Sequence, residues 1–283
     1  MGYILKAENH RGEVINLSTN PNYILYKIEG LQPPSVNVNV SDNATSDGST
    51  FNSARANSRN IVLYIAIKGV VEVNRINLYK YFPLKKKIKL YYKNGTRDVY
   101  IEGYVELIEC DLFSDKQVAQ ISIICPQPYF KAVDEVISYF SEVSSYFTFP
   151  FSTTKSGVEL SAITTNIRKS IIYAGDVESG IIIKLYAIGE VVNPVIYDVF
   201  NRTYIKLNCA MEVNDEIIIN TYKGEKSITL IRNGESSNVM GYMSADSTWL
   251  TLQSGDNVFT YDSDSGNSNL QLTFVTSILY GGV

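Results

Sequence analysis

The chain has 283 residues, of which 45% are hydrophobic and 19% charged, and its formal net charge is -4. This composition supplies enough apolar side chains for packed cores and excludes an intrinsically disordered chain. The slightly acidic balance excludes the basic surface that nucleic-acid-binding proteins use. The 21 Tyr and 11 Phe residues favour strands, because aromatic side chains suit a half-buried pleated surface.

The residues that usually carry catalysis or bind metals are scarce. The single histidine, His10, lies in a polar stretch, and Cys110, Cys125 and Cys209 form no CxxC pair. Zinc sites and acid–base triads depend on such residues, and the sequence contains no nucleotide-binding or hydrolase motif. We therefore predict no catalytic residue, no metal and no cofactor, and the odd number of cysteines argues against a disulfide framework.

Export and membrane signals are also missing from the sequence. The opening segment Met1–Lys6 is too short an apolar run for a signal peptide. Every hydrophobic run falls far below the roughly 18 residues that suggest a membrane span. The sequence thus predicts a protein that folds in reducing cytosol and does not insert into a membrane.

The first strands are predicted at Tyr23–Ile28 and Val36–Val40, and the second alternates strictly between apolar and polar residues. The segment Ser41–Asn60 is polar apart from Phe51. A polar stretch of this length between strands is unusual inside a compact domain. It is therefore either disordered or an arm that reaches a neighbour.

The one convincing helix of the sequence follows an apolar strand at Ile61–Ile67. It is predicted at Val71–Phe82, where Val71, Arg75, Leu78 and Phe82 share one face. Pro83 ends the pattern, since proline cannot continue a helix. We expect this helix to face the core.

A hairpin is predicted after the helix, with strands Ile88–Tyr92 and Val99–Glu109 on either side of Asn94–Gly95. This dipeptide favours a tight turn, because both of its residues tolerate positive φ. Strict alternation along the return strand places Val105 and Leu107 on the same face.

The N-terminal half is predicted to end after a strand at Val118–Ile124. Pro126 and Pro128 interrupt pairing there and mark a domain edge, and residues 131–146 are predicted as a mixed connector. A length of 283 residues also suits two domains of about 100–200 residues each. The predicted domains are residues 1–140, with the arm at 41–60, and residues 141–283.

From Phe147 onward the sequence predicts strands at short intervals, separated by markers such as Asn193–Pro194 and Asn233–Gly234. This spacing favours an antiparallel sandwich. The run Asp262–Gly266 lacks the Gly and Glu spacing of a calcium loop, so we interpret it as a hairpin turn between two strands. Trp249 is interpreted as a core residue, with a sugar-stacking platform as the alternative.

The second half resembles a known family in the order and spacing of its segments. The segments that carry the resemblance are Gly175–Gly180, Asn193–Pro194, Asn214–Thr221, Lys223–Ser227, Trp249–Phe259 and Tyr280–Val283. Together they resemble the C-terminal galectin-like sandwich of distal tail proteins from phages with long tails. The first half fits the same family through its helix at Asn74–Phe82, the Lys-rich strand that follows and the segment Pro126–Phe130 at the end of this half.

This resemblance implies an all-β fold with one helix, in which a tail-tube-like β-sandwich precedes a galectin-like β-sandwich. It implies a structural hub protein rather than an enzyme. Six copies are expected to form a homohexamer ring that joins the tail tube protein to the tail-tip hub protein, and receptor-binding or other baseplate proteins are further expected partners. DNA is expected only to pass through the channel. The expected location is the virion tail tip or baseplate, after synthesis in the host cytoplasm.

The arm at Ser41–Asn60 resembles the belt loop of this family, which embraces the neighbouring subunit. Phe51 is its only large apolar residue and is predicted to anchor in a pocket of the neighbour. Arg55 and Arg59 are predicted to pair with carboxylates of that neighbour. The alternative for the arm is a disordered loop with Phe51 against its own domain. The alternative function is a carbohydrate-binding module for host cell-wall glycans, with Trp249 as its candidate contact.

Overall fold

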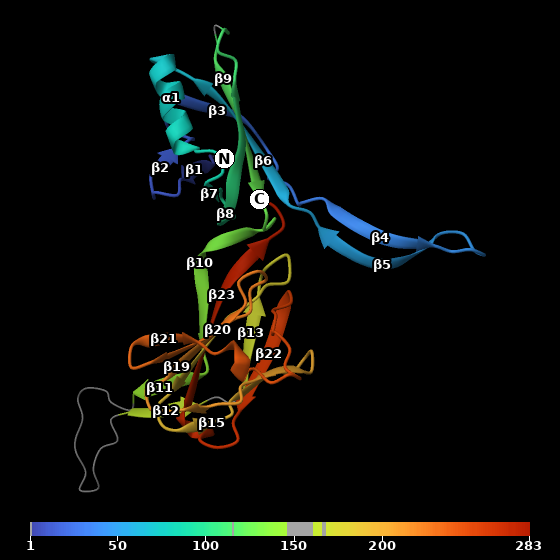
Figure 1. Cartoon of the computed structure of the whole chain (residues 1–283), viewed down its shortest axis with the longest axis vertical. Coiled ribbons are helices and arrows are strands. Elements are labelled where there is room, and N and C mark those ends of the chain that lie inside the picture. Colours follow the sequence, from blue (N-terminus) through green and yellow to red (C-terminus); the bar gives the residue numbers. More distant parts are fainter. Residues whose placement is uncertain (1, 115, 146–160, 166–167) are drawn as a thin grey trace. The chain divides into compact units, whose positions relative to one another are not determined.

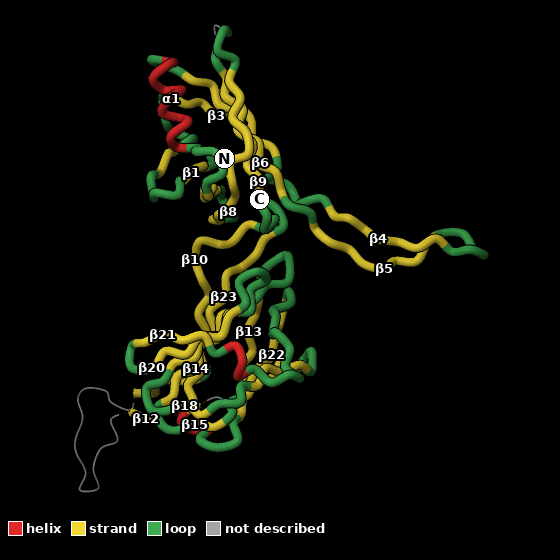
Figure 2. Tube along the Cα trace, viewed as in Figure 1, coloured by secondary structure: helices red, strands yellow, loops and turns green. Residues whose placement is uncertain are grey.

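The structure is a computed structural model that describes residues 2–114, 116–145, 161–165 and 168–283. The chain divides into two compact units (Figure 1), of which unit 1 comprises Met1–Asp134 and Leu279–Val283 and unit 2 comprises Glu135–Ile278. Both consist mainly of strands (Figure 2). The division places residues 279–283 with unit 1, and separate folding of residues 1–140 and 141–283 stays a prediction.

Unit 1 is built from antiparallel strands that surround one core. Neighbouring strands pair in the order β2, β1, β7, β8, β9, β6 and β3. The bounds are β1 (Ile4–Glu8), β2 (Val14–Asn16), β3 (Tyr23–Glu29), β4 (Val36–Asp42), β5 (Ser49–Ala56), β6 (Arg59–Ile67), α1 (Val71–Tyr81), β7 (Lys87–Lys93), β8 (Asp98–Cys110) and β9 (Val118–Cys125).

One face of β6 and one side of the helix point into the unit 1 core. Along β6 the residues Ile61, Leu63 and Ile65 are fully buried, and Val62 and Tyr64 between them are half-buried. This alternation is the period of a strand with one face on the core. The predicted helix is confirmed as α1, in which Leu78 is fully buried, and the C-cap residue Phe82 that follows Tyr81 is fully buried as well.

The predicted face of β8 is wrong beyond Val105. The pairing register shifts between Val105 and Leu107, so that Glu106 is an extra residue in the strand. A β-bulge of this kind reverses which residues face inward. As a result Leu107 is exposed, and Ile108 packs against the core in its place.

The tight turn predicted at Asn94–Gly95 is also wrong. Strands β7 and β8 pair out to Lys93 and Asp98, and neither residue of the dipeptide has positive φ. The side-chain oxygen of Asn94 instead accepts hydrogen bonds from the backbone amides of Thr96 and Arg97, at 2.9 and 2.8 Å. An asparagine that bonds to the backbone ahead of it supports a wider loop than the two-residue turn.

The connector predicted at residues 131–146 is a strand region. Strand β10 (Phe130–Tyr139) begins in unit 1, where Lys131 and Ala132 pair with β8, and continues into unit 2. Strand β11 (Ser141–Ser145) follows it. The start of the second unit predicted at Phe147 lies outside the described residues.

Unit 2 is a sandwich of two antiparallel sheets. One sheet contains β23, β14, β19, β20 and β21, and the other contains β13, β22, β16 and β17. The bounds are β12 (Ser161–Thr165), β13 (Arg168–Tyr173), β14 (Ile182–Ala187), β15 (Val191–Val192), β16 (Val195–Asp198), β17 (Thr203–Lys206), β18 (Ala210–Met211), β19 (Glu216–Asn220), β20 (Ser227–Arg232), β21 (Glu235–Asn238), β22 (Gly255–Asp262) and β23 (Leu270–Tyr280), with short 3-10 turns η1 (Met240–Tyr242) and η2 (Asn267–Asn269).

The two sheets of unit 2 share a core that is rich in aromatic residues. Phe140 and Phe274 approach with ring centroids 4.8 Å apart, and Phe259 meets Phe274 edge-on at 5.0 Å. Phe259 comes from the four-stranded sheet and Phe274 from the other. Such aromatic pairs add to the free energy gained by burial alone. The predicted fold class, all-β with one helix, is confirmed for the described residues.

The segment Asp262–Gly266 is not the hairpin turn that the sequence predicts. Strand β22 before it pairs with β13 and β16, whereas β23 after it pairs with β14. The segment therefore crosses from one sheet of the sandwich to the other. Gly266 has a φ of +78°, and a Cβ atom there would overlap the Glu190 carbonyl. This close approach explains the need for glycine.

Candidate assembly interface

The arm predicted in the N-terminal half is a regular two-stranded ribbon. Strands β4 and β5 form a sheet of their own (Figure 1). Every residue of β4 is exposed, and in β5 only Ala56 is half-buried. The ribbon thus covers Val36–Ala56, and it begins before the predicted limit at Ser41. The alternative of a disordered loop is wrong, because the segment is regularly paired.

The ribbon has one apolar face. Residues directly opposite each other in an antiparallel pair project from the same face. Val40 lies opposite Phe51. The register shifts between Asn39 and Val40, and on the other side of this bulge Val38 lies opposite Ala54 and Val36 opposite Ala56. The residues of this apolar arm face are Val36, Val38, Val40, Phe51, Ala54 and Ala56. Asn37, Asn39, Ser41, Thr50, Ser53 and Arg55 lie on the opposite, polar face.

The apolar arm face has no cover within its own chain. Phe51 is 63% exposed, and Val36, Val38 and Val40 are 51%, 57% and 48% exposed. Single two-stranded ribbons are marginally stable in water, and exposed apolar patches mark interaction surfaces. The alternative in which Phe51 packs on its own domain is therefore wrong, and the side chain is available to a partner. Arg55 is exposed on the polar face.

Arg59 is buried against its own chain, which corrects its predicted pairing with a carboxylate of a neighbour. It lies at the first position of β6 and is 3% exposed. Its guanidinium donates hydrogen bonds to four backbone carbonyls of its own chain. The acceptors are Pro128 at 2.7 Å, and Gly30, Gln32 and Gly281 at 2.5 Å each. Burial lowers the pKa of Arg59, but an arginine stays protonated in proteins.

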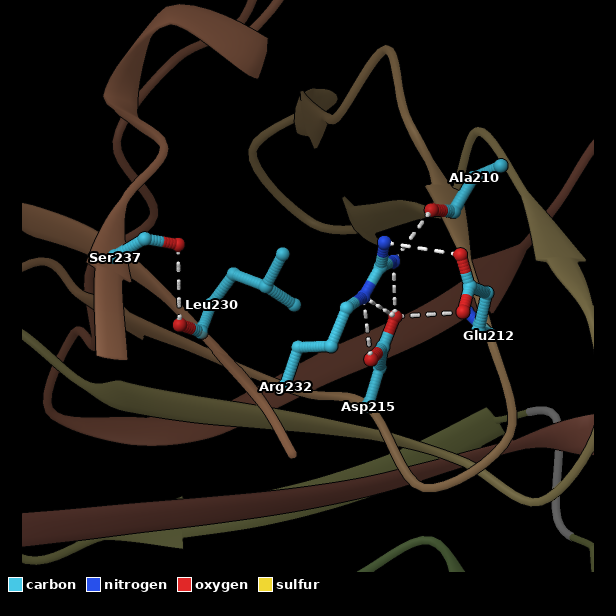
Figure 3. Close-up of polar contacts among 6 residues, drawn as sticks. All are labelled: Ala210, Glu212, Asp215, Leu230, Arg232 and Ser237. Atoms are coloured by element: carbon cyan, nitrogen blue, oxygen red, sulfur yellow. Dashed lines mark hydrogen bonds and ion pairs between the residues drawn. The ribbon is translucent and has the colours of Figure 1, made fainter. Parts of the chain in front are cut away.

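An ion cluster in unit 2 has a structural role (Figure 3). Buried Asp215 accepts hydrogen bonds from Arg232 Nε at 2.9 Å, from Arg232 Nη2 at 2.5 Å and from the Glu212 amide at 2.7 Å. Burial by itself would raise the pKa of Asp215, but these hydrogen bonds and the charge of Arg232 lower it overall. A carboxylate with this many donors is held ionised. The cluster secures the turn before β19.

Trp249, the predicted glycan contact, is half-buried against the unit 2 core. The ammonium group of Lys226 lies 5.2 Å from the centroid of its ring. This cation–π contact lies over one face of the ring, where it would compete with a sugar for stacking. The setting favours the interpretation of Trp249 as a core residue, and a glycan contact there stays a prediction.

The described residues offer little else that resembles a reactive site. Within the described part of the chain, no group of three His, Cys, Asp or Glu side chains is arranged to hold a metal ion. Burial raises the pKa of Cys125 to about 12 and that of Cys209 to about 11. Among the same described residues, no helix is long and apolar enough to cross a membrane.

The architecture, with two β units and one exposed ribbon, has the fold of phage tail hub proteins. It matches over its whole length a crystal structure described as SPP1 Dit (gp 19.1), "a paradigm of hub adsorption apparatus in Gram-positive infecting phages". The TM-score is 0.69 at 9% identity, and the match covers 99% of each chain. A chain of the phage P2 baseplate in its calcium-activated conformation matches with a TM-score of 0.54 at 13% identity, over 98% of each chain.

The family comparison agrees with this fold. Residues 174–277 match the family of the siphovirus-type tail component, C-terminal domain. The matched residues lie in unit 2, and the resemblance to distal tail proteins is confirmed. No curated protein matches the chain.

Proposed function

We propose that this protein is a structural hub of a phage tail tip or baseplate, in which six copies close into a ring. The fold match over the whole chain and the tail component domain in unit 2 support a tail or baseplate hub. The observation that carries ring formation is the uncovered apolar arm face, with Phe51 at 63% exposure. An arm that packs on the next copy makes a head-to-tail contact, and such contacts generate a closed ring when the rotation closes.

In this proposal the N-terminal units form the ring, which joins the tail tube protein to the tail-tip hub protein. The C-terminal units are then available to receptor-binding or other baseplate proteins. The role is structural and needs no catalysis, and DNA passes through the ring without a binding site. The mild net charge of -4 suits this passage, since strong phosphate binding requires clustered cations.

Native mass spectrometry and negative-stain electron microscopy test the ring directly. We expect a six-fold ring for the parent protein, formed at high concentration or on a purified tail tip. The variant Phe51→Asp should remain monomeric, because it places a charge on the apolar arm face. The matched variant Ser53→Asp, on the polar face of the same strand, should still assemble. A three- or five-fold particle, or assembly of Phe51→Asp at the parent's concentration, would overturn the proposal.

A further inference from the structure

Hydrogen bonds of Arg59 and Asn57 join the two legs of the chain at the base of the arm. The chain enters the arm through Gly30 and Gln32 and returns from it at Arg59. Nη1 of Arg59 donates to the carbonyls of both Gly30 and Gln32, each at 2.5 Å. The returning leg of the arm therefore binds the leg that leaves. A backbone hydrogen bond from Asn57 to Ser35, at 2.9 Å, adds to this connection.

The same guanidinium ties the base of the arm to residues 279–283. Nη2 of Arg59 donates to the Gly281 carbonyl at 2.5 Å. The amide of Val283 donates to the Leu31 carbonyl at 3.1 Å, beside the outgoing leg. Gly282 packs so closely that a Cβ atom there would lie 2.9 Å from Cδ and 3.0 Å from the nitrogen of Pro33. The segment thus fits tightly against the base of the arm.

Burial makes these contacts interdependent. Arg59 is a cation with 3% exposure, stacked 4.7 Å from the centroid of the Phe130 ring. A buried charge whose donors lose their acceptors is strongly unfavourable. If Gly281 moved away, Nη2 would lose this acceptor in a place where water has little access. Arg59 is therefore well placed only when the segment 279–283 has docked.

We propose that Arg59 and residues 279–283 form a clasp that fixes the base of the arm and makes the arm competent for ring closure. Residues 279–283 are synthesised after the rest of unit 1, and they follow unit 2 directly along β23. The clasp thus closes only when the chain has passed through unit 2. Late closure of the clasp would keep the arm from associating before the chain has folded, since an exposed apolar ribbon is prone to premature association. The inference rests on the proposed role of the arm in the ring.

A pair of neighbouring glycines provides the test in the full chain. Gly282→Ala introduces a methyl group against Pro33, whereas a Cβ at Gly281 meets no atom within 4 Å. Hydrogen exchange of the dilute monomer should show the amides of Val283 and Asn57 exchanging about tenfold faster in Gly282→Ala, since overpacking against rigid backbone weakens the docked state. Gly281→Ala should exchange as the parent does. Arg59→Lys should resemble Gly282→Ala, because one ammonium group cannot reach the four carbonyls.

Ring assembly is then measured for the same variants. We expect Gly282→Ala and Arg59→Lys to need a higher concentration than the parent for half-assembly, with unchanged thermal unfolding of unit 2. Parent-like exchange in Gly282→Ala would overturn the clasp. Faster exchange combined with parent-like assembly would overturn its role in ring closure. A parent protein that forms no ring would overturn the proposed function instead, and the exchange measurement would still decide whether the clasp exists.

Discussion

Replacement of Phe51 by alanine tests the arm quantitatively. A phenylalanine side chain buries about 200 Å² when it is fully enclosed, so 63% exposure leaves about 125 Å² for a partner to cover. At ~25 cal/mol per Å², loss of this burial weakens each contact between copies by about 3 kcal/mol. That free energy corresponds to about a hundredfold increase in the dissociation constant of each contact. The monomer loses little, because the side chain is largely in water there.

Sedimentation velocity over a concentration series measures this effect. The midpoint of assembly should move to higher concentration for Phe51→Ala, while the melting temperature of the dilute monomer stays nearly constant. Ser53→Ala is the matched control, because Ser53 is exposed on the polar face of the same strand. Equal midpoints for Phe51→Ala and the parent would refute the reasoning that the apolar arm face binds the next copy. A large fall in monomer melting temperature would show that Phe51 acts within its own unit.

Three further predictions concern charged and sulfur-containing groups. Arg55→Gln should weaken assembly by less than about tenfold, because exposed ion pairs contribute little, and the difference should vanish at high salt in the same sedimentation assay. Asp215→Asn should lower the free energy of unfolding of unit 2 by about 1.5 kcal/mol in urea titrations. This value lies at the lower end of the range for hydrogen bonds to charged groups, because Arg232 is partly exposed. Because the pKa of Asp215 is lowered in the folded protein, this stabilisation is present above the ordinary carboxyl pKa and is lost as the pH falls through the folded-state pKa. The unfolding free energies of parent and variant should therefore become equal in acid. Iodoacetamide at pH 8, followed by mass spectrometry, should modify half-buried Cys110 before buried Cys125, whose thiol has a pKa of about 12.

Residue patterns of short range were sufficient to predict much of the fold. The helix at Val71–Tyr81 follows from a few apolar positions and a proline that stops it, and all of these lie within a dozen or so residues of one another. The strand at Arg59–Ile67 was predicted from the continuous apolar run Ile61–Ile67. The apolar residues of the arm were visible as a different pattern, since Val36, Val38 and Val40 alternate with polar residues. The pattern did not reveal that this strand leaves the core and carries its apolar face into solvent.

Two identical dipeptides show where local sequence stops being sufficient. Asn233–Gly234 has positive φ at both residues and joins the paired Arg232 and Glu235, which is the tight turn expected of Asn-Gly. Asn94–Gly95 has the same residues and forms a wider loop with neither φ positive. The register of the flanking strands decides between these turns, and register is set by packing across the sheet.

The sequence by itself determined the β-rich fold class, the helix in the described chain and the scarcity of catalytic residues, because these depend on composition and on periodicity over a few residues. The tertiary structure alone decided the role of Arg59. From its position beside a polar arm it was predicted to meet a neighbouring subunit, yet it is buried within its own unit. The reason is that Gly281, which supplies one of its acceptors, lies 222 positions further along the chain. No local pattern encodes which distant carbonyls will surround a guanidinium, since that is set by how the chain packs.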